Sequence, residues 1–271
     1  MKVAIFILTF NEELHIERAV SSALKITNDI YVIDSFSRDS TKVLAEKLGA
    51  KVIQKEWRGF SLQINYAINF LKEKYDWVIR LDADEYFSEE FVKNISFFLR
   101  TSSNYVNGIF VERSIIFKNH LIRYGGLYKV PVIRIFNPKE VYCDDKEMDE
   151  KIRIKRGKTS NYPFQIIDKN EKDLNFWVKK HLTYSDLEIK NIYLKKYDMK
   201  SSYSKNSKNE LSKDEIKLLY YKLIPILRCF LLFLYRYIYK LGFLDGLRGF
   251  YFHFLQTLWY RLVIDSKLFY K

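Results

Sequence analysis

The sequence has 271 residues, of which 48% are hydrophobic, enough for one large domain or for a domain with an appended segment. Aromatic residues reach 17% while Gly is 9 and Pro is 4, which excludes disordered, collagen-like and low-complexity chains. The formal net charge of +13 is uneven: residues 1–177 carry 28 basic and 25 acidic side chains, and residues 178–271 carry 18 and 8, which predicts an anionic partner for the C-terminal third.

The N-terminal apolar run, Val3 to Thr9, is too short for a signal peptide and is followed by acidic residues, so it predicts a buried strand. Cys143 and Cys229 cannot form a disulfide framework and favour a reducing compartment, although one bridge between them stays open. We therefore expect a cytoplasmic protein.

Short apolar runs alternate with segments of helical period up to about residue 100. The expected strands are Val3–Leu8, Ile30–Ile33, Lys51–Ile53 and Trp77–Leu81, and the expected helices are Leu14–Leu24, Ser40–Leu48, Leu62–Lys74 and Glu89–Leu99. This order predicts an α/β fold with a mostly parallel sheet and helices on both faces. We expect Ser37, Asp39 and Ser40 to cap the second helix and Gly49 to end it.

The helical rhythm is lost between residues 105 and 170, where further strands are expected at Gly108–Arg113, Val132–Phe136 and Lys151–Lys155. Residues 201–214 are rich in Ser, Lys and Asn and predict a linker. We predict a catalytic domain at residues 1–185 and a basic, aromatic helical region at residues 186–271.

Polar residues follow three of the expected strands. The first strand runs into Thr9-Phe10-Asn11-Glu12-Glu13, the second into Asp34-Ser35-Phe36-Ser37, and the fourth into Asp82-Ala83-Asp84-Glu85. Any one of these segments alone is typical of a helix start or a cap. Parallel strands bring all three to one sheet edge, where such folds bind ligands.

Three carboxylates within Asp82–Glu85 repel one another unless a cation or hydrogen-bond donors offset the charge. Hard ions such as Mg²⁺ or Mn²⁺ suit such a site. The chain has neither a dinucleotide-binding glycine motif nor a P-loop, and its four histidines, His15, His120, His181 and His253, lack zinc spacing. These absences disfavour redox chemistry, P-loop phosphoryl transfer and a zinc centre.

Taken together, the motifs resemble the family 2 inverting glycosyltransferases of GT-A fold, and within them the lipopolysaccharide-core glucosyltransferases called WaaE-like. The first hundred residues contribute Ile7–Glu13, Val32–Thr41, Trp57–Phe60 with Gln63 and Asn65, and Leu81–Glu85; the rest of the chain contributes Arg123–Tyr128, Arg134–Phe136 and Gly242–Gly246. The resemblance covers nearly the whole chain and implies a GT-A, Rossmann-like catalytic domain.

The resemblance also implies roles for individual residues. It implies that Thr9, Asn11, Glu13, Asp34 and Asp82 contact the nucleotide sugar. It implies that Asp84 and His181 bind the metal, and that Glu150 or Asp149 is the catalytic base. Asp149 stands where the group has a histidine, so the two carboxylates remain interchangeable as base. Packing in a core remains an equal alternative for His181.

The expected reaction is metal-dependent transfer of a hexose from a UDP-sugar to a lipopolysaccharide-core glycolipid, and glucose is the favoured hexose. A carboxylate takes the acceptor proton and the metal balances charge on the leaving diphosphate. The alternatives are a polyprenyl phosphate or other cell-surface acceptor, a non-catalytic nucleotide binder and a basic nucleic-acid-binding protein. The last is least favoured, because the carboxylates would repel phosphates and no nucleic-acid motif is present.

Residues 216–241 predict an amphipathic helix, whose longest charge-free run, Cys229–Tyr235, is too short to span a membrane. Helical periodicity gathers basic residues on one face, Lys217, Lys222, Arg228, Arg236 and Lys240, and apolar residues on the other, Leu219, Leu223, Phe230, Leu234 and Leu241. Pro225 is expected to interrupt or kink it early. Such a helix, with the apolar segment Phe250–Phe269, favours a peripheral position on the anionic inner face of the cell membrane; packing on the catalytic domain is the alternative.

Overall fold

The computed structural model describes residues 1–102, 105–145, 150–201 and 220–270, without side chains at 191 and 193–201. The chain divides into two compact units, Met1–Leu121 with Leu127–Lys172, and Ile122–Gly126 with Asp173–Lys271, here called the sheet unit and the helical unit. The boundary expected after residue 185 falls inside a continuous helix, α5 (Leu174–Ser201). Residues 202–214 of the expected linker lie outside the described residues.

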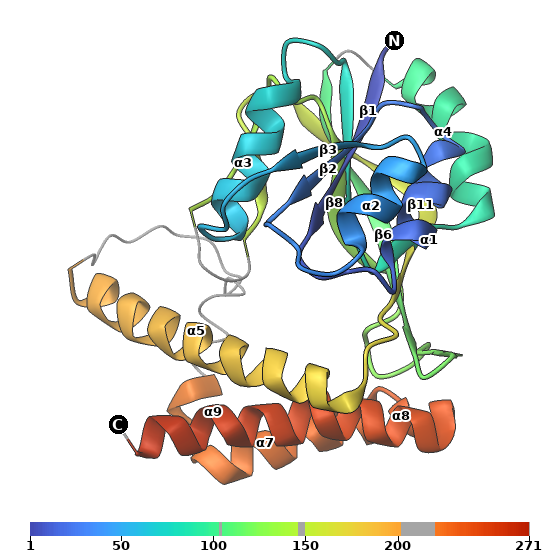
Figure 1. Cartoon of the computed structure of the whole chain (residues 1–271). Coiled ribbons are helices and arrows are strands. Elements are labelled where there is room, and N and C mark those ends of the chain that lie inside the picture. The colour runs from blue at the N-terminus through green and yellow to red at the C-terminus, as the bar shows by residue number, and fades with distance from the viewer. Residues whose placement is uncertain (103–104, 146–149, 202–219, 271) are drawn as a thin grey trace. The chain divides into compact units, whose positions relative to one another are not determined.

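The sheet unit is built on one large sheet with the strand order β3-β2-β1-β4-β8-β6-β11-β5, and β7 pairs with β6 (Figure 1). Its strands are β1 (Val3–Thr9), β2 (Ile30–Asp34), β3 (Lys51–Gln54), β4 (Trp77–Asp82), β5 (Glu85–Phe87), β6 (Val106–Phe117), β7 (His120–Leu121), β8 (Val130–Phe136) and β11 (Lys158–Lys169). Strands β1 to β4 are parallel to one another. The expected strand 151–155 instead forms β10 (Ile152–Ile154), paired with β9 (Val141–Cys143) in a separate small sheet.

Helices cover both faces of the sheet, α1 (Ile16–Leu24), α2 (Thr41–Lys47) and α4 (Glu89–Thr101) on one side and α3 (Phe60–Leu71) on the other (Figure 1). Each face of the sheet has its own hydrophobic core, and alternate β1 residues point into one or the other. Ile5 and Ile7 pack with α1, whereas Ala4 and Phe6 pack with α3. Burial on both faces explains why β1 is a continuous apolar run. The expected α/β class, with a central sheet between helices, is confirmed; the sheet is mixed, because β5, β7 and β8 run antiparallel to their neighbours.

The cap expectations for α2 hold in part. Gly49 follows the helix with φ +88°, a left-handed conformation that glycine adopts without strain. Ser40 makes no side-chain cap bond, while Asp39 accepts a bond of 3.0 Å from the Thr41 amide. Asp39 rather than Ser40 therefore satisfies the free amide at the start of α2.

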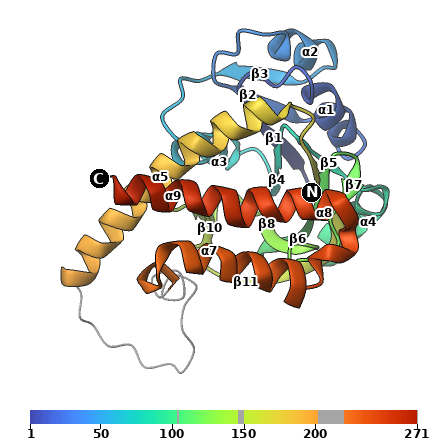
Figure 2. The same ribbon diagram turned by 90° about the horizontal axis from the view of Figure 1, so that it is seen from below.

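The helical unit consists of α5 (Leu174–Ser201), α7 (Pro225–Leu234), η1 (Tyr235–Tyr239), η2 (Gly242–Asp245), α8 (Gly246–His253), η3 (Phe254–Trp259) and α9 (Tyr260–Phe269). Elements α8, η3 and α9 form one continuous helical run (Figure 2). Helix α5 packs on α9 through Ile189 and Ile264, and Glu188 pairs with Arg261 at 2.7 Å. Both cysteines are free and buried.

One expectation for the C-terminal segment is confirmed and another is wrong. The helix is interrupted at Leu223 and Ile224, and Pro225 begins α7, because proline tolerates the first helical turn. The predicted continuous basic face is interrupted, since Arg228 is 3% exposed and bonds Asp265. None of the described helices is long and apolar enough to cross a lipid bilayer.

Two sequence motifs that carried the resemblance meet inside the helical unit. The Asp245 carboxylate accepts bonds from the backbone amides of Arg123, at 3.1 Å, and Tyr124, at 2.9 Å. The Gly125 amide donates to the Lys240 carbonyl at 2.9 Å. The segment 122–126, far from the rest of its unit in sequence, is thus held by the turn at η2; we call this arrangement the Asp245 clasp.

Candidate functional site

The strand ends predicted to converge lie at one sheet edge. Strands β1 and β2 pair with Thr9 beside Asp34, and β1 and β4 pair with Leu8 beside Asp82. The Thr9 hydroxyl donates to Asp34 Oδ1 at 3.0 Å. Strand β11 is parallel to β6 and runs in the direction of β1, so its carboxyl end reaches the same edge. We call this region the carboxyl edge.

Asp34 is completely buried at the end of β2. Its carboxylate accepts hydrogen bonds from the Thr9 hydroxyl, the Ser37 amide and the Gln54 side chain. Protein donors therefore occupy both oxygens, and in this structure Asp34 orders the loop after β2. Its expected contact with the nucleotide sugar stays a prediction.

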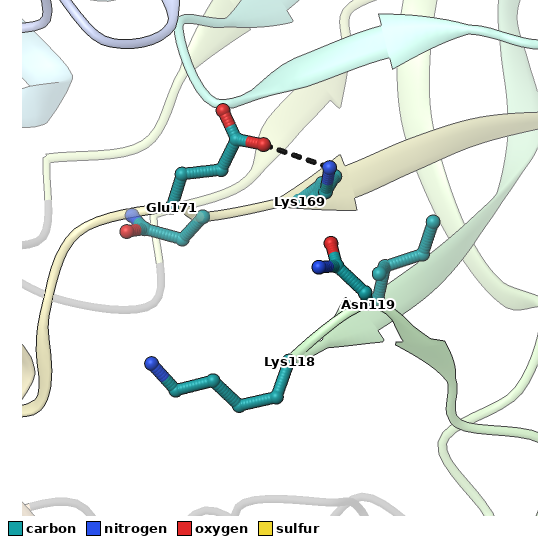
Figure 3. Close-up of a pocket in the computed structure, with 6 residues that line it drawn as sticks. Lys118, Asn119, Lys169 and Glu171 are labelled. Atoms are coloured by element: carbon teal, nitrogen blue, oxygen red, sulfur yellow. Dashed lines mark ion pairs between the residues drawn. The ribbon is translucent and has the colours of Figure 1, made fainter.

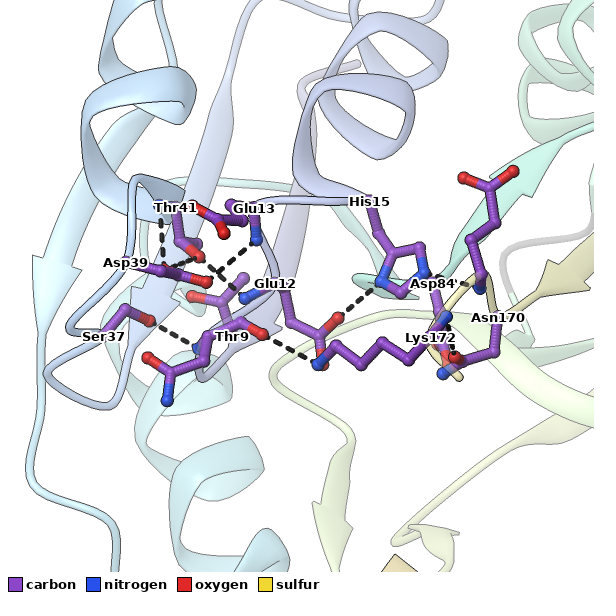
Figure 4. A network of polar contacts seen from close by, with 12 residues as sticks. Thr9, Glu12, Glu13, His15, Ser37, Asp39, Thr41, Asp84, Asn170 and Lys172 are labelled. Atoms are coloured by element: carbon purple, nitrogen blue, oxygen red, sulfur yellow. Dashed lines mark hydrogen bonds and ion pairs between the residues drawn. The ribbon is translucent and has the colours of Figure 1, made fainter. Parts of the chain in front are cut away.

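The loop after β1 is fastened to the loop after β2 (Figure 4). Asn11 has φ 55°, a conformation that asparagine tolerates better than most residues. Its amide donates to Ser37 Oγ at 2.9 Å and its Oδ1 accepts from the Arg38 amide at 2.8 Å. Glu13 accepts from the Ser40 amide at 3.0 Å. The structure thus brings together Thr9, Asn11, Glu13 and Asp34, all expected at the nucleotide, around two interlocked loops.

Asp82 and Glu85 belong to a buried ionic network. Arg134, 4% exposed, donates to Asp82 Oδ2 and to Glu85 Oε1, each at 2.6 Å. Burial opposes ionisation, but Arg134 and Arg80 outweigh it and hold the pKa of Asp82 well below its usual range. Arginine donors occupy both oxygens of Asp82, and its expected contact with the nucleotide sugar stays a prediction.

Arg80 joins the candidate base to this network. Its Nε lies 3.1 Å from Asp82 Oδ1, and its Nη2 lies 3.3 Å from Glu150 Oε1. Glu150 therefore approaches the carboxyl edge through a charge-assisted contact, although it is 70 residues from Arg80 in sequence. The alternative base, Asp149, lies outside the described residues.

Asp84 stands in the turn between β4 and β5. Its Oδ2 accepts from Asn170 Nδ2 at 2.9 Å, and its carbonyl accepts from the Lys169 amide, also at 2.9 Å. No described residue donates to Oδ1. Among the described residues no group of three or more metal-ligating side chains occurs. This donor set fits Mg²⁺ or Mn²⁺ shared with a diphosphate and water, since such ions need only one or two protein carboxylates.

The segment after β11 is also tied to the carboxyl edge (Figure 4). Lys172 donates to the Asn11 carbonyl at 2.7 Å and to Glu12 Oε1 at 2.8 Å. The buried His15 ring contacts Glu12 on one nitrogen and accepts from the Glu171 amide on the other. Strand β1 and strand β11 are therefore cross-linked by charged and polar contacts.

The sequence did not single out Asn170 and Lys172, which follow β11 as the predicted residues follow their strands, or Asp168, which lies near the end of β11. Burial and the nearby Asp84 carboxylate raise the pKa of Asp168 to about 8. A protonated Asp168 lowers the negative charge around Asp84 at neutral pH. The sequence did not predict strand β11, so these residues were not recognised as lying at the end of a strand.

A polar pocket of about 200 Å³ adjoins this segment (Figure 3). Its lining comes from the β6–β7 turn, which includes Lys118 and Asn119, from Lys169 at the end of β11, and from Asn170 and Glu171 after that strand. Lys169 and Glu171 form an ion pair of 2.7 Å. Because Asn170 both lines the pocket and bonds Asp84, the pocket borders the candidate metal ligand.

His181 belongs to the helical unit. Its ring stacks on Trp177 with centroids 3.5 Å apart, and its Nδ1 lies 2.9 Å from the Trp177 carbonyl. Burial lowers the pKa of His181 to about 4. The structure therefore gives this histidine a packing environment, and its expected contact with a metal or diphosphate stays a prediction.

Comparison with known proteins decides the class of the sheet unit, because residues 4–137 match the family described as Glycosyl transferase family 2. Residues 4–137 form a glycosyltransferase family 2 domain. The match includes all three polar strand ends and Arg134, and it stops before Glu150.

Relatives named as uncharacterised glycosyltransferases share part of this domain. One from Rickettsia bellii (strain RML369-C) is 42% identical over 96 residues, which cover 35% of this chain and 32% of the relative. One from Rickettsia prowazekii (strain Madrid E) is 40% identical over 103 residues, which cover 38% and 34%. The chain thus spans about a third of the length of the curated relatives it matches.

Solved structures of low identity are also similar. Staphylococcus aureus TarS 1–349 in complex with UDP-GlcNAc is 16% identical, with a TM-score of 0.47 over 64% of this chain and 60% of that one. Glucosyl-3-phosphoglycerate synthase from Mycobacterium tuberculosis, in complex with Mn²⁺, UDP and glucosyl-3-phosphoglycerate, is 20% identical, with a TM-score of 0.35 over 42% and 44%.

Proposed function

We propose that the protein is a metal-dependent inverting glycosyltransferase. It moves a hexose, with glucose as the first candidate, from a UDP-sugar to a lipopolysaccharide or lipooligosaccharide core acceptor at the cytoplasmic face of the cell membrane. The observation that carries this proposal is the carboxyl edge itself. It unites Thr9, Asp34 and Asp84 within a family 2 domain and links Glu150 to Asp82 through Arg80.

The arrangement divides the reaction between two carboxylates. Glu150 accepts the proton of the acceptor hydroxyl as the new bond to the anomeric carbon forms and the bond to the nucleoside diphosphate breaks. Asp84 would hold Mg²⁺ or Mn²⁺, which would stabilise negative charge on the leaving diphosphate. Asn170 fixes the Asp84 carboxylate by binding its Oδ2 at 2.9 Å. Because Glu150 acts as a base and not as a nucleophile, no covalent sugar–enzyme intermediate forms.

A thermal-shift series with UDP, GDP, ADP and CMP, each with and without Mn²⁺, tests the donor class. We expect stabilisation by UDP that depends on Mn²⁺, because the metal neutralises repulsion between Asp84 and the diphosphate. Asp84→Asn should abolish the Mn²⁺-dependent part of the shift. Absence of a shift with every nucleotide would contradict the proposal.

Transfer from UDP-glucose then separates an enzyme from a nucleotide-binding protein. Glu150→Gln should retain the nucleotide shift and lose roughly a hundredfold or more in turnover, as expected for removal of a general base. Glu73→Gln, an exposed carboxylate substitution, is the matched control and should retain full turnover. Nucleotide binding without turnover on either a core glycolipid or a polyprenyl phosphate would indicate a non-catalytic binder, and turnover on only the polyprenyl phosphate would replace the core acceptor.

A further inference from the structure

Helix α7 exposes apolar side chains along one face of the helical unit. The α7–η1 stripe comprises Ile226, Leu227, Phe230, Leu231, Leu234 and Ile238, each between 44% and 63% exposed. Their spacing of three or four residues, with adjacent pairs, places them on one side of a helix. Leu244, Leu247 and Tyr251, from η2 and α8, are 51%, 70% and 52% exposed.

The polar side of α7 is the side that is buried. Arg228, 3% exposed, donates from Nε to Asp265 Oδ2 at 3.1 Å and from Nη1 to the Tyr221 carbonyl at 2.8 Å. Cys229 beside it is fully buried. A helix on a water-facing surface normally buries its apolar face, whereas here a buried ion pair fixes α7 with that face outward.

Within residues 220–270, the segment that carries this face, the exposed charges are of one sign. Within the described range 220–270 the acidic residues are Asp245 and Asp265, 5% and 7% exposed, and both bond partners inside the helical unit. The exposed charged residues of the same range are Lys222, Lys240 and Arg248. A second copy of this face would oppose like charges, whereas anionic lipid headgroups complement them.

We propose that the α7–η1 stripe, with the neighbouring η2–α8 turn, inserts into the interface of a bilayer that contains anionic phospholipid. The aliphatic and aromatic side chains enter the acyl boundary, and Lys222, Lys240 and Arg248 contact headgroup phosphates. This inference deepens the membrane location in the proposed function by naming the surface. Its test measures lipid binding alone, so it can fail while sugar transfer succeeds, and the reverse.

The test is co-sedimentation of the full chain with vesicles of equal parts phosphatidylglycerol and phosphatidylcholine, compared with vesicles of phosphatidylcholine alone. We expect binding to the mixed vesicles that weakens as salt is added, because headgroup attraction is screened. Leu227→Gln/Leu231→Gln/Leu234→Gln should reduce the partition coefficient by about tenfold or more. Asp84→Asn, which is expected to lose metal-dependent nucleotide binding, should bind vesicles as the wild type does.

A matched variant controls for loss of apolar surface in general. Val43→Gln/Leu62→Gln/Phe97→Gln changes three apolar residues of the sheet unit that are 65%, 53% and 73% exposed, and it should leave vesicle binding unchanged. Lys222→Glu/Lys240→Glu/Arg248→Glu should abolish the preference for phosphatidylglycerol without altering the stripe. Equal sedimentation of the wild type and the α7 variant would overturn the proposal. So would a wild-type dimer in light scattering that the α7 variant abolishes while neither binds vesicles.

Discussion

Arg80 is a charged side chain within a strand whose neighbours, Ile79 and Leu81, are fully buried. Arginine is rarely buried unless it is paired, and Arg80 is paired twice, with Asp82 and with Glu150. Its fork of donors can hold two carboxylates at once, which lysine does less well. We interpret Arg80 as a positioning residue that keeps the candidate base at the carboxyl edge.

Arg80→Gln is expected to lower kcat by roughly tenfold to a hundredfold while the KM for the sugar donor changes little, because Arg134 still holds both oxygens of Asp82, the donor-binding candidate beside Arg80. Arg80→Lys should recover part of kcat, since it restores the charge. Steady-state kinetics with UDP-glucose measures both. The control is Arg58→Gln, because Arg58 and its partner Glu56 are both 69% exposed. Unchanged kcat in Arg80→Gln, or a loss confined to KM, would refute the positioning role.

Residues of the carboxyl edge were predictable where a polar residue follows a short apolar strand. Thr9, Asp34 and Asp84 each satisfied that rule, and the parallel register places their strand ends side by side. The contacts that fix these residues were not predictable, because they span long separations: Asn170 reaches Asp84 across 86 residues, and Arg134 reaches Asp82 across 52. Periodicity carries no information about such partners.

At the scale of elements, β11 shows how a strand escapes sequence prediction. It contains Pro163, and its register with β6 shifts between Tyr162 and Gln165. A bulge there breaks the alternation of inward and outward side chains on which strand prediction depends. For α7 the sequence wrongly placed Arg228 on an exposed basic face. Its ion-pair partner, Asp265, lies on another helix, and helical periodicity within one segment cannot reveal such a partner.

The Asp245 clasp explains why glycines stand in the two motifs it joins. Gly125 has φ +77°, and a Cβ there would overlap the His253 ring. At Gly242 a Cβ would lie 2.7 Å from His253 Cδ2 and 2.9 Å from the Arg236 carbonyl. The glycines allow the His253 ring to pack directly against the backbone of both segments.

Substitutions in the clasp should destabilise the helical unit. We expect Gly242→Ala to cost about 1–3 kcal/mol through overpacking, and Asp245→Asn to cost about 1–3 kcal/mol because two backbone amides lose a charged acceptor. Chemical denaturation followed by circular dichroism measures both changes. Asp186→Asn, at a side chain that is 61% exposed, should change stability by less than about 0.5 kcal/mol. Clasp variants as stable as that control would show that the clasp contributes nothing.

At the scale of the whole molecule, the two units differ in how protons bind to them. His253 is fully buried, and burial together with Arg236 lowers its pKa to about 4 despite the opposing Asp245; burial gives His181 a similar value. An unfolded histidine titrates near 6.5. Between these values the unfolded helical unit binds protons that the folded unit does not, so its stability is complete above 6.5 and falls as the pH drops toward 4.

The sheet unit is expected to respond in the opposite sense. Its Asp168 has a pKa of about 8, above the ordinary value of 3.8, so the folded unit retains a proton that the unfolded chain releases. The stability from this group is complete below 3.8 and is lost as the pH rises toward 8. The low pKa of Asp82 changes the stability of the sheet unit only in more acidic solution, where this carboxylate would take up a proton in the unfolded chain.

Calorimetry without divalent ions should therefore resolve two transitions that move differently between pH 7.5 and 5.5. The transition of the helical unit should move down by a few degrees, corresponding to a loss on the order of 1 kcal/mol for His253, and that of the sheet unit should not move down. UDP with Mn²⁺ at pH 7.5 should raise only the transition of the sheet unit. His253→Gln should reduce the pH shift, and His120→Gln in the sheet unit should leave it intact. A single transition that follows both pH and nucleotide would show that the two units unfold as one, and an unchanged pH shift in His253→Gln would remove this histidine as its cause.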